Sequence, residues 1–406
     1  MFFFGFGSGL PFLLVGYSVS TWLRDEGTPL RYIGLISYAA LFYTLKFLWA
    51  PLLDRLPAPL VGRLGRRRGW LLLSQLLVAG AVAAMALTGP QGDLSLFVSL
   101  IGLAALAGAT QDTVVDAYRI EIAPVELQGA LAATYTLGYR LSLLASGAGV
   151  LYLAEFSGWK VAYLSMAALM LAPIGATLLA REPQVEVDRT SSLTATFTGP
   201  FLEFFRRNGW VLALALLAFV GLFKLPDQML GVIAGPFYLD SGFNKAEIAT
   251  VSKLYGVWIG IAGAFLGGVA IAGWGIRIPL VIAAVAVSLS NLLFIVMSVF
   301  PGQSWAFMVT ISGDNLAQGF AGTTLVAFMS GLANKHYTAT QYALLSSLAN
   351  LPGRLIGGLS GFMVEAWGYT GFFVFSTVSV VPTLVVMAWL WPKVGREVAA
   401  TEKAAG

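Results

Sequence analysis

Long apolar runs alternate with short polar connections along the whole chain. A membrane-spanning helix needs about 20 consecutive, mostly apolar residues, and the runs have about that length. Glycine and proline separate several of them, as at Thr88-Gly89-Pro90 and at Pro301-Gly302. The pattern therefore predicts an all-α integral membrane protein with twelve transmembrane helices. The predicted helices occupy residues 2–23, 32–53, 69–88, 94–118, 127–154, 159–180, 210–238, 246–272, 277–299, 304–333, 339–366 and 369–392.

The second half of the chain repeats the first. A Leu-Pro pair with a glycine five residues after the proline occurs at residues 10–16 and again at 225–231, an offset of 215. At an offset of 214, "RLSLLASG" from Arg140 aligns with "RLIGGLSG" from Arg354. Two parallel six-helix repeats are the organisation of the major facilitator fold. We therefore expect that fold, with two six-helix pseudo-repeats.

One long polar connection separates the two sets of six helices. It joins the sixth and seventh runs and carries charges of both signs. The expected parts are an N-terminal six-helix bundle at 1–180, a cytoplasmic linker at 181–208, a C-terminal six-helix bundle at 209–392 and a cytoplasmic tail at 393–406.

Composition and charge agree with a membrane protein. Charged residues make up 11% of the chain, against about a quarter in a typical soluble domain. If both termini are cytoplasmic, 15 of the 24 lysines and arginines lie in inner loops and 4 in outer loops. The positive-inside rule then places both ends in the cytoplasm. The basic residues therefore indicate orientation in a lipid bilayer, and we expect no nucleic-acid partner.

The chain has no cysteine and a single histidine. Disulfides, thiolate metal sites and histidine clusters are therefore excluded. We expect no metal and no cofactor.

Nine charged residues are candidates for burial within the predicted helices. A charge in mid-membrane costs from about 2.5 kcal/mol upward, so each needs a partner or a water-filled cavity. Nine are too many for a purely structural bundle, and we expect a polar cavity between the halves. The nine are Lys46, Asp112, Asp116, Arg140, Lys224, Asp227, Lys253, Asp314 and Arg354.

The stretch "LAGATQDTVVDAYRIE" places Asp112, Asp116 and Arg119 on one helix face, because they lie within about 60° of each other at 100° per residue. A charge network that caps the helix end would explain Asp116 and Arg119. Asp112 lies about two turns deeper, and we expect it to be the proton-coupling carboxylate, since burial and a like charge both favour proton uptake. Asp227 is the second candidate, and Asp116 and Asp314 are further ones.

Arg140 and Arg354 occupy equivalent positions in the two repeats. Arginine stays charged and binds carboxylates with two parallel hydrogen bonds. One interpretation is a clamp on an anionic substrate, with Lys46 and Lys224 as further bases. The alternative is structural, with Arg140 paired to an aspartate of the fourth helix and Arg354 paired to Asp314. Lys224 and Asp227, three residues apart, can likewise pair with each other.

The connection between the second and third helices reads "APLLDRLPAPLVGRLGRRRGW". It resembles a loosened form of the Asp-Arg…Gly-Arg-Arg signature of major facilitator transporters. That resemblance implies a lock on the inner face. The expected gating residues are Asp54, Arg55, Arg66, Arg67 and Arg119.

Glycines recur at helical spacing at residues 256–267 and 353–361. Small residues at this spacing allow close helix contact in membranes. A nucleotide site is excluded, because no strand or phosphate loop accompanies them.

Several motifs together resemble the AmpG muropeptide permease family, with acetyl-coenzyme A transporters as a more distant match. They are "LKFLWAPLLDR", "GRRRGWLL", "QDTVVDAYR", "LGYRL", "LFKLPD" and "TATQYALLSSL". The resemblance implies proton-driven import of N-acetylglucosaminyl-anhydro-N-acetylmuramyl peptides across a bacterial inner membrane. It also implies that Asp112, Asp116, Arg140, Lys224 and Asp227 are functional residues, together with Lys46.

The residue types suit such a glycopeptide. Four bases can neutralise the carboxylates of its peptide. Tyrosines at a similar depth can stack on sugar faces, although each can also serve helix packing. The tyrosines are Tyr43, Tyr135, Tyr139 and Tyr255.

Two other function classes are the alternatives. A carrier of another solute, such as acetyl-coenzyme A or a drug exported from the cell, shares the fold, although the buried bases argue against export of cationic drugs. A membrane enzyme is the second class, and the sequence offers no nucleophile–base pair or metal cluster for it. We therefore expect a transporter, without catalytic residues, that works as a monomer with protons and a small-molecule glycopeptide.

Overall fold

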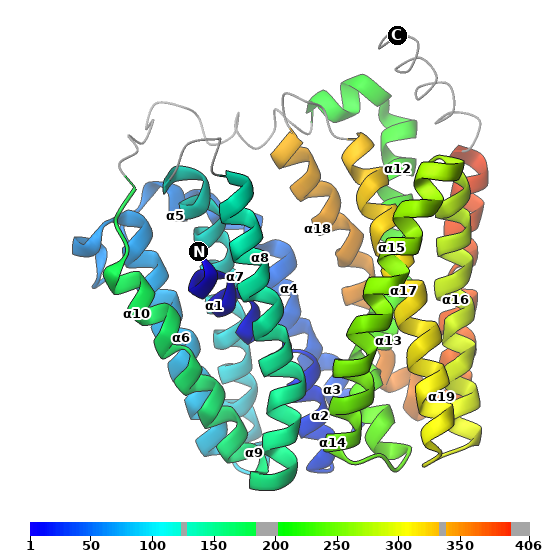
Figure 1. Ribbon diagram of the computed structural model, residues 1–406, viewed down its shortest axis with the longest axis horizontal. Coiled ribbons are helices and arrows are strands. Elements are labelled where there is room, and N and C mark those ends of the chain that lie inside the picture. Colours follow the sequence, from blue (N-terminus) through cyan, green and yellow to red (C-terminus); the bar gives the residue numbers. More distant parts are fainter. Residues whose placement is uncertain (123–127, 184–201, 333–337, 391–406) are drawn as a thin grey trace. The chain divides into compact units, whose positions relative to one another are not determined.

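The computed structural model describes residues 1–122, 128–183, 202–332 and 338–390 (Figure 1). Within these ranges the chain is helical and contains no strand. It divides into two compact units, one of residues 1–191 with 232–255, the other of 192–231 with 256–406. The expected fold class is confirmed. The bundle boundaries remain predictions, and residues 232–255 group with the first unit.

The first unit holds the helices of the N-terminal half and a short piece of the C-terminal half. Its elements are α1 (Phe2–Leu14), α2 (Tyr17–Asp25), α3 (Leu30–Ile36), η1 (Ser37–Ala40), α4 (Leu41–Leu45), η2 (Lys46–Leu48), α5 (Ala50–Arg55), η3 (Gly62–Leu64), α6 (Arg66–Thr88), α7 (Leu94–Ile122), α8 (Gln128–Leu144), η5 (Ala145–Gly149), α9 (Val150–Leu169), α10 (Leu171–Leu179), the second part of α13 (Leu225–Asp240), α14 (Lys245–Ile248) and η6 (Ala249–Tyr255).

The second unit contains the remaining helices of the C-terminal half. Among them are α12 (Trp210–Phe223), the first part of α13, α15 (Gly256–Trp274), α16 (Arg277–Val299), α17 (Ser304–Leu332), α18 (Thr338–Gly357) and α19 (Ser360–Val378). Within this unit α15 packs along α17, and α16 packs along both α17 and α19.

Eight helical stretches among the described residues are long and apolar enough to cross a membrane. One of them, Thr134–Leu179, has 46 residues, which at 1.5 Å per residue is enough for two crossings of a core about 30 Å thick. Gly158 divides it with a φ of 81°. All twelve runs expected from the sequence are largely helical over their described residues.

Several expected spans are not among the eight, and their structures give the reason. The segment expected as a helix at 32–53 consists of short α and 3₁₀ pieces from α3 to α5. Helix α17 has 29 residues but carries Asp314, Asn315 and Gln318. Polar residues and irregular backbone are tolerated at membrane depth where protein or a cavity surrounds them.

Glycine allows the closest helix contacts, as expected. A Cβ on Gly263 of α15 would lie 2.2 Å from the backbone oxygen of Leu316, and one on Gly319 of α17 would lie 2.0 Å from that of Gly260. In the first unit, a Cβ on Gly5 of α1 would lie 2.0 Å from the backbone oxygen of Tyr135 on α8. These backbones touch, so any larger residue would separate the helices.

Candidate functional site

Asp112 of α7 lies at the centre of a partly buried polar cluster in the first unit. The Nζ of Lys46 donates to one oxygen of its carboxylate, and the two side chains are 29% and 17% exposed, respectively. The hydroxyl of Tyr135 donates to the other oxygen at 2.9 Å. Charge-assisted hydrogen bonds of this kind are strong. The cluster therefore joins three of the predicted residues from three separate helical segments.

Each segment presents its residue for a local reason. Lys46 begins η2, a short 3₁₀ piece between α4 and α5, so this part of the chain does not follow a regular α-helical path. Tyr135 lies on α8 at a point where Gly5 lets α1 and α8 touch. Its ring also lies 6.0 Å from that of Tyr139.

Asp116 lies one turn further along α7, is more exposed and has a more distant basic partner. Its side chain is 47% exposed, and its Oδ1 lies 3.8 Å from the Nη2 of Arg119. Asp112 is bound by two donors at a much less exposed position. The two carboxylates on the same face therefore differ in exposure and in bonding, which is consistent with separate roles.

Arg140 is not the partner of Asp112. It is exposed on α8, and among the described side chains it forms no ion pair. Lys46 occupies the place that the structural alternative gave to Arg140. The proposed role of Arg140 as a substrate-binding residue stays a prediction.

The second unit holds four candidates of the C-terminal half. Lys224 caps the end of α12, and Asp227 lies in the first turn of α13, so both flank a break in the seventh predicted helix. In the described part of the chain they form no ion pair within 4.0 Å. Asp314 of α17 is 6% exposed and accepts a hydrogen bond of 2.8 Å from Gln318. Arg354 is half-buried on α18.

The remaining predicted aromatics take part in packing. The ring of Tyr43 meets Phe12 edge to face, with centroids 5.4 Å apart, and its hydroxyl lies against Gly108. Tyr255 ends the π-helix η6. Stacking on a sugar remains a prediction for all four tyrosines.

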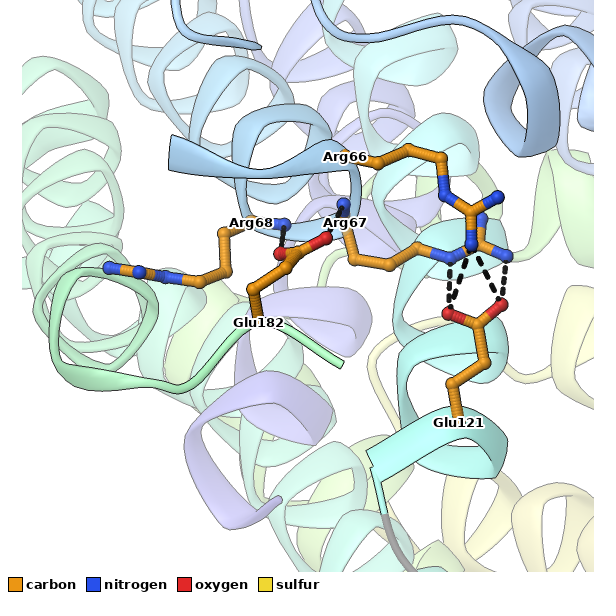
Figure 2. A network of polar contacts seen from close by, with 5 residues as sticks. All are labelled: Arg66, Arg67, Arg68, Glu121 and Glu182. Carbon is orange, nitrogen blue, oxygen red and sulfur yellow. Dashed lines mark hydrogen bonds and ion pairs between the residues drawn. The ribbon is translucent and has the colours of Figure 1, made fainter. Parts of the chain in front are cut away.

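Two of the expected gating arginines, Arg66 and Arg67, bind Glu121 within the first unit (Figure 2). Arg67, only 3% exposed, donates to Glu121 of α7 from Nε at 2.9 Å and from Nη2 at 2.5 Å. Arg66 adds longer contacts of 3.3 and 3.4 Å to the same carboxylate. The side chains of Asp54 and Arg55 lie outside the described part. Glu121 was missed by the sequence analysis, although it follows Arg119 by two residues.

A reciprocal cap ties α6 to α10 next to this network. The carboxylate of Glu182 accepts from the backbone N–H groups of Arg67 and Arg68 at 2.7 and 2.9 Å (Figure 2). In return, the guanidinium of Arg68 donates to the backbone oxygens of Thr177 and Leu178 at the end of α10. Both helix ends thus gain partners for groups that helices leave unbonded.

A second ion-pair cluster, also missed by the sequence analysis, joins segments far apart in the chain. Arg24 of α2 binds Asp240 of α13 through two bonds of 2.7 Å. Lys245 binds Asp25 at 2.9 Å and lies 3.8 Å from Glu155. Asp25 and Asp240 are separated by the repeat offset of 215. The repeat could therefore have indicated them, since each equivalent acid binds a base from the other half.

Comparison with known proteins places the chain. Residues 1–358 match the family model of the Major Facilitator Superfamily. The chain is 35% identical over 402 residues to the putative transporter AmpG 4 of Rickettsia conorii, covering 97% of this chain and 96% of that one. It is also 35% identical over 386 residues to the anhydromuropeptide permease of Escherichia coli strain K12, covering 94% and 77%.

Solved structures agree on the fold. A POT family transporter in complex with 5-aminolevulinic acid superposes with a TM-score of 0.72 at 15% identity, covering 97% of this chain and 96% of that one. This likeness concerns the fold alone. Together with the sequence relatives, it identifies a multi-pass membrane transporter. The chain belongs to the AmpG muropeptide permease family of the major facilitator superfamily.

Proposed function

We propose that the protein imports anhydromuropeptides across the bacterial inner membrane, driven by protons, by alternating access with both termini in the cytoplasm. The substrate class is supported by the 35% identity to an anhydromuropeptide permease over 94% of the chain. The observation that carries the mechanism is the Asp112 cluster, a carboxylate held by Lys46 and Tyr135 inside a membrane-spanning helix.

Protonation of Asp112 would change the cluster in a defined way. The ionised carboxylate attracts the Lys46 ammonium and accepts from Tyr135. A protonated carboxyl group loses the ionic attraction, so Lys46 becomes available to a carboxylate of the substrate. Loss of the proton on the cytoplasmic side restores the internal pair and releases the substrate.

The other bases extend this scheme to a substrate with several carboxylates. Arg140 is exposed on α8 and is not bound by an acid among the described residues. Its guanidinium can therefore take a substrate carboxylate without first breaking an internal pair. Arg354 is its repeat equivalent, and we assign both to the substrate clamp.

The decisive experiment is uptake of labelled anhydromuropeptide into proteoliposomes, with and without an inward proton gradient. We expect accumulation above the outside concentration only with the gradient. Acetyl-coenzyme A is the competitor to include, because carriers of another anionic solute share the fold. Accumulation of acetyl-coenzyme A without that of the glycopeptide would replace the proposed substrate. Accumulation of the glycopeptide without a gradient would exclude protons as the driving force.

A further inference from the structure

Buried polar groups link α16 to the break in the seventh predicted helix. Asn291, near the middle of α16, and Ser376 of α19 are both 0% exposed. The Nδ2 of Asn291 donates to the Oγ of Ser376 at 2.7 Å. That hydroxyl donates in turn to the backbone oxygen of Pro226 at 3.1 Å. We call this chain of two hydrogen bonds the Asn291 relay.

The relay ends where the helix is interrupted. Pro226 has no N–H group and cannot continue the hydrogen-bond ladder of α12 into α13. Asp227 is the next residue along the chain. On the following residue, the Nε2 of Gln228 donates to the side-chain oxygen of Asn350 on α18 at 2.9 Å. The first turn of α13 is therefore held by α19 at Pro226 and by α18 at Gln228.

Asn291 is a costly choice for this position if its role is only to pack. An amide removed from water costs free energy unless all its polar atoms are bonded. The Oδ1 of Asn291 is buried and has no hydrogen-bond partner among the described residues. A leucine of similar size would avoid that cost. This cost favours a role in the relay over a role in packing alone.

We propose that Asn291 is a positioning residue for transport. Through Ser376 it fixes the carbonyl of Pro226, and thereby the orientation of the helix turn that carries Asp227. The inference rests on the proposed function in one respect, namely that Asp227 takes part in transport.

The test compares variants at one helix interface. Asn291→Leu and Ser376→Ala each break the relay. Ser288→Ala is the matched control, because the Oγ of Ser288 donates to the backbone oxygen of Thr377 between the same two helices at 2.6 Å. We expect the relay variants to lower the maximal uptake rate about fivefold, the size of one net hydrogen bond, while the control keeps the wild-type rate.

Two further readouts separate positioning from loss of folding. The thermal unfolding temperature of Asn291→Leu should equal or exceed that of the wild type, because an unbonded buried acceptor is removed. The double variant Asn291→Leu/Ser376→Ala should lose no more uptake than the more affected single variant, since both break one relay. Wild-type uptake by Asn291→Leu, or losses that add, would overturn the proposal.

A measurement without substrate keeps the relay testable by itself. The chain has no cysteine, so Leu222→Cys, half-buried beside the break, introduces a single thiol. We expect Asn291→Leu and Ser376→Ala to change its maleimide labelling rate and Ser288→Ala to leave it unchanged. Absence of glycopeptide uptake by the wild type would contradict the proposed function alone. Equal labelling in all variants would contradict the relay alone.

Discussion

Asp112 and Asp116 are two aspartates on one face of α7 that the structure treats differently. Asp112 is bound by Lys46 and Tyr135, whereas Asp116 is 47% exposed and lies 3.8 Å from Arg119. An acid that must gain and lose a proton during each cycle needs a partner that responds to its charge. Lys46 is such a partner, because its attraction to Asp112 depends on that charge.

Asp112→Asn should therefore uncouple transport from protons. Asparagine keeps the size and an acceptor for Tyr135 but has no charge to gain or lose. We expect uphill uptake into proteoliposomes to fall to background while exchange of substrate across the membrane without a gradient continues. Asp116→Asn is the control and should keep most of the uphill uptake. An Asp112→Asn protein that still concentrates substrate would exclude this residue as the coupling site.

Arg140 and Arg354 give a second prediction at the same scale. Lysine keeps the charge but cannot form the two parallel bonds that a guanidinium makes to a carboxylate. Arg140→Lys and Arg354→Lys should weaken uptake of the peptide-bearing substrate more than uptake of the peptide-free disaccharide. Competition assays with both compounds measure the difference. Equal losses for the two would indicate a structural role.

The sequence predicted which charges lie within helical segments, because a charge in a long apolar run is conspicuous. It did not predict that Lys46 binds Asp112. Helical periodicity gives a direction only in a regular helix, and Lys46 begins a 3₁₀ piece in a segment of short helices. The buried Asn291 was missed for another reason, since one uncharged polar residue in an apolar run gives little signal.

Helix ends carry most of the ion pairs that the sequence analysis did not anticipate. Glu121 and Glu182 lie near the ends of α7 and α10 and bind residues at the start of α6 (Figure 2). Their partners are distant in sequence, so spacing along one helix could not reveal them. The arginine motif was recognised, but its acids could be identified only from the packing of three helices.

The buried member of this arginine pair should matter more for stability. Arg67 is 3% exposed with bonds of 2.5 and 2.9 Å, whereas the Arg66 contacts are 3.3 and 3.4 Å. Removing one partner of a buried ion pair costs about 3 kcal/mol or more. Arg67→Met should lower the unfolding temperature in detergent clearly, and Arg66→Met only slightly. Equal shifts would show that Glu121 is satisfied by either arginine.

The pair of Arg24 and Asp240 is suited to a charge-reversal test. Both side chains are partly exposed, at 28% and 24%. If the pair holds α2 against α13 during transport, Arg24→Asp and Asp240→Arg should each reduce uptake, and the double reversal should restore much of it. Initial uptake rates measure this. Failure of the double variant to recover would mean that the residues act separately.

At the scale of the whole molecule, the internal repeat relates individual residues of the two halves as well as their helices. Arg140 and Arg354, and likewise Asp25 and Asp240, are equivalent residues with different surroundings. Arg140 is exposed and Arg354 is half-buried. Asp25 binds Lys245 and Asp240 binds Arg24. Equivalent positions of the repeat thus differ in exposure or in binding partner.

The contact between α15 and α17 limits how the second unit can move. At Gly263 and Gly319 each helix touches the other's backbone, with room for a hydrogen atom only. Sliding one helix past the other by a single residue would bring a side chain into that space. We therefore expect the two helices to move together as one rigid body. A chemical cross-link placed between them should leave turnover intact, whereas it would stop a mechanism in which they slide.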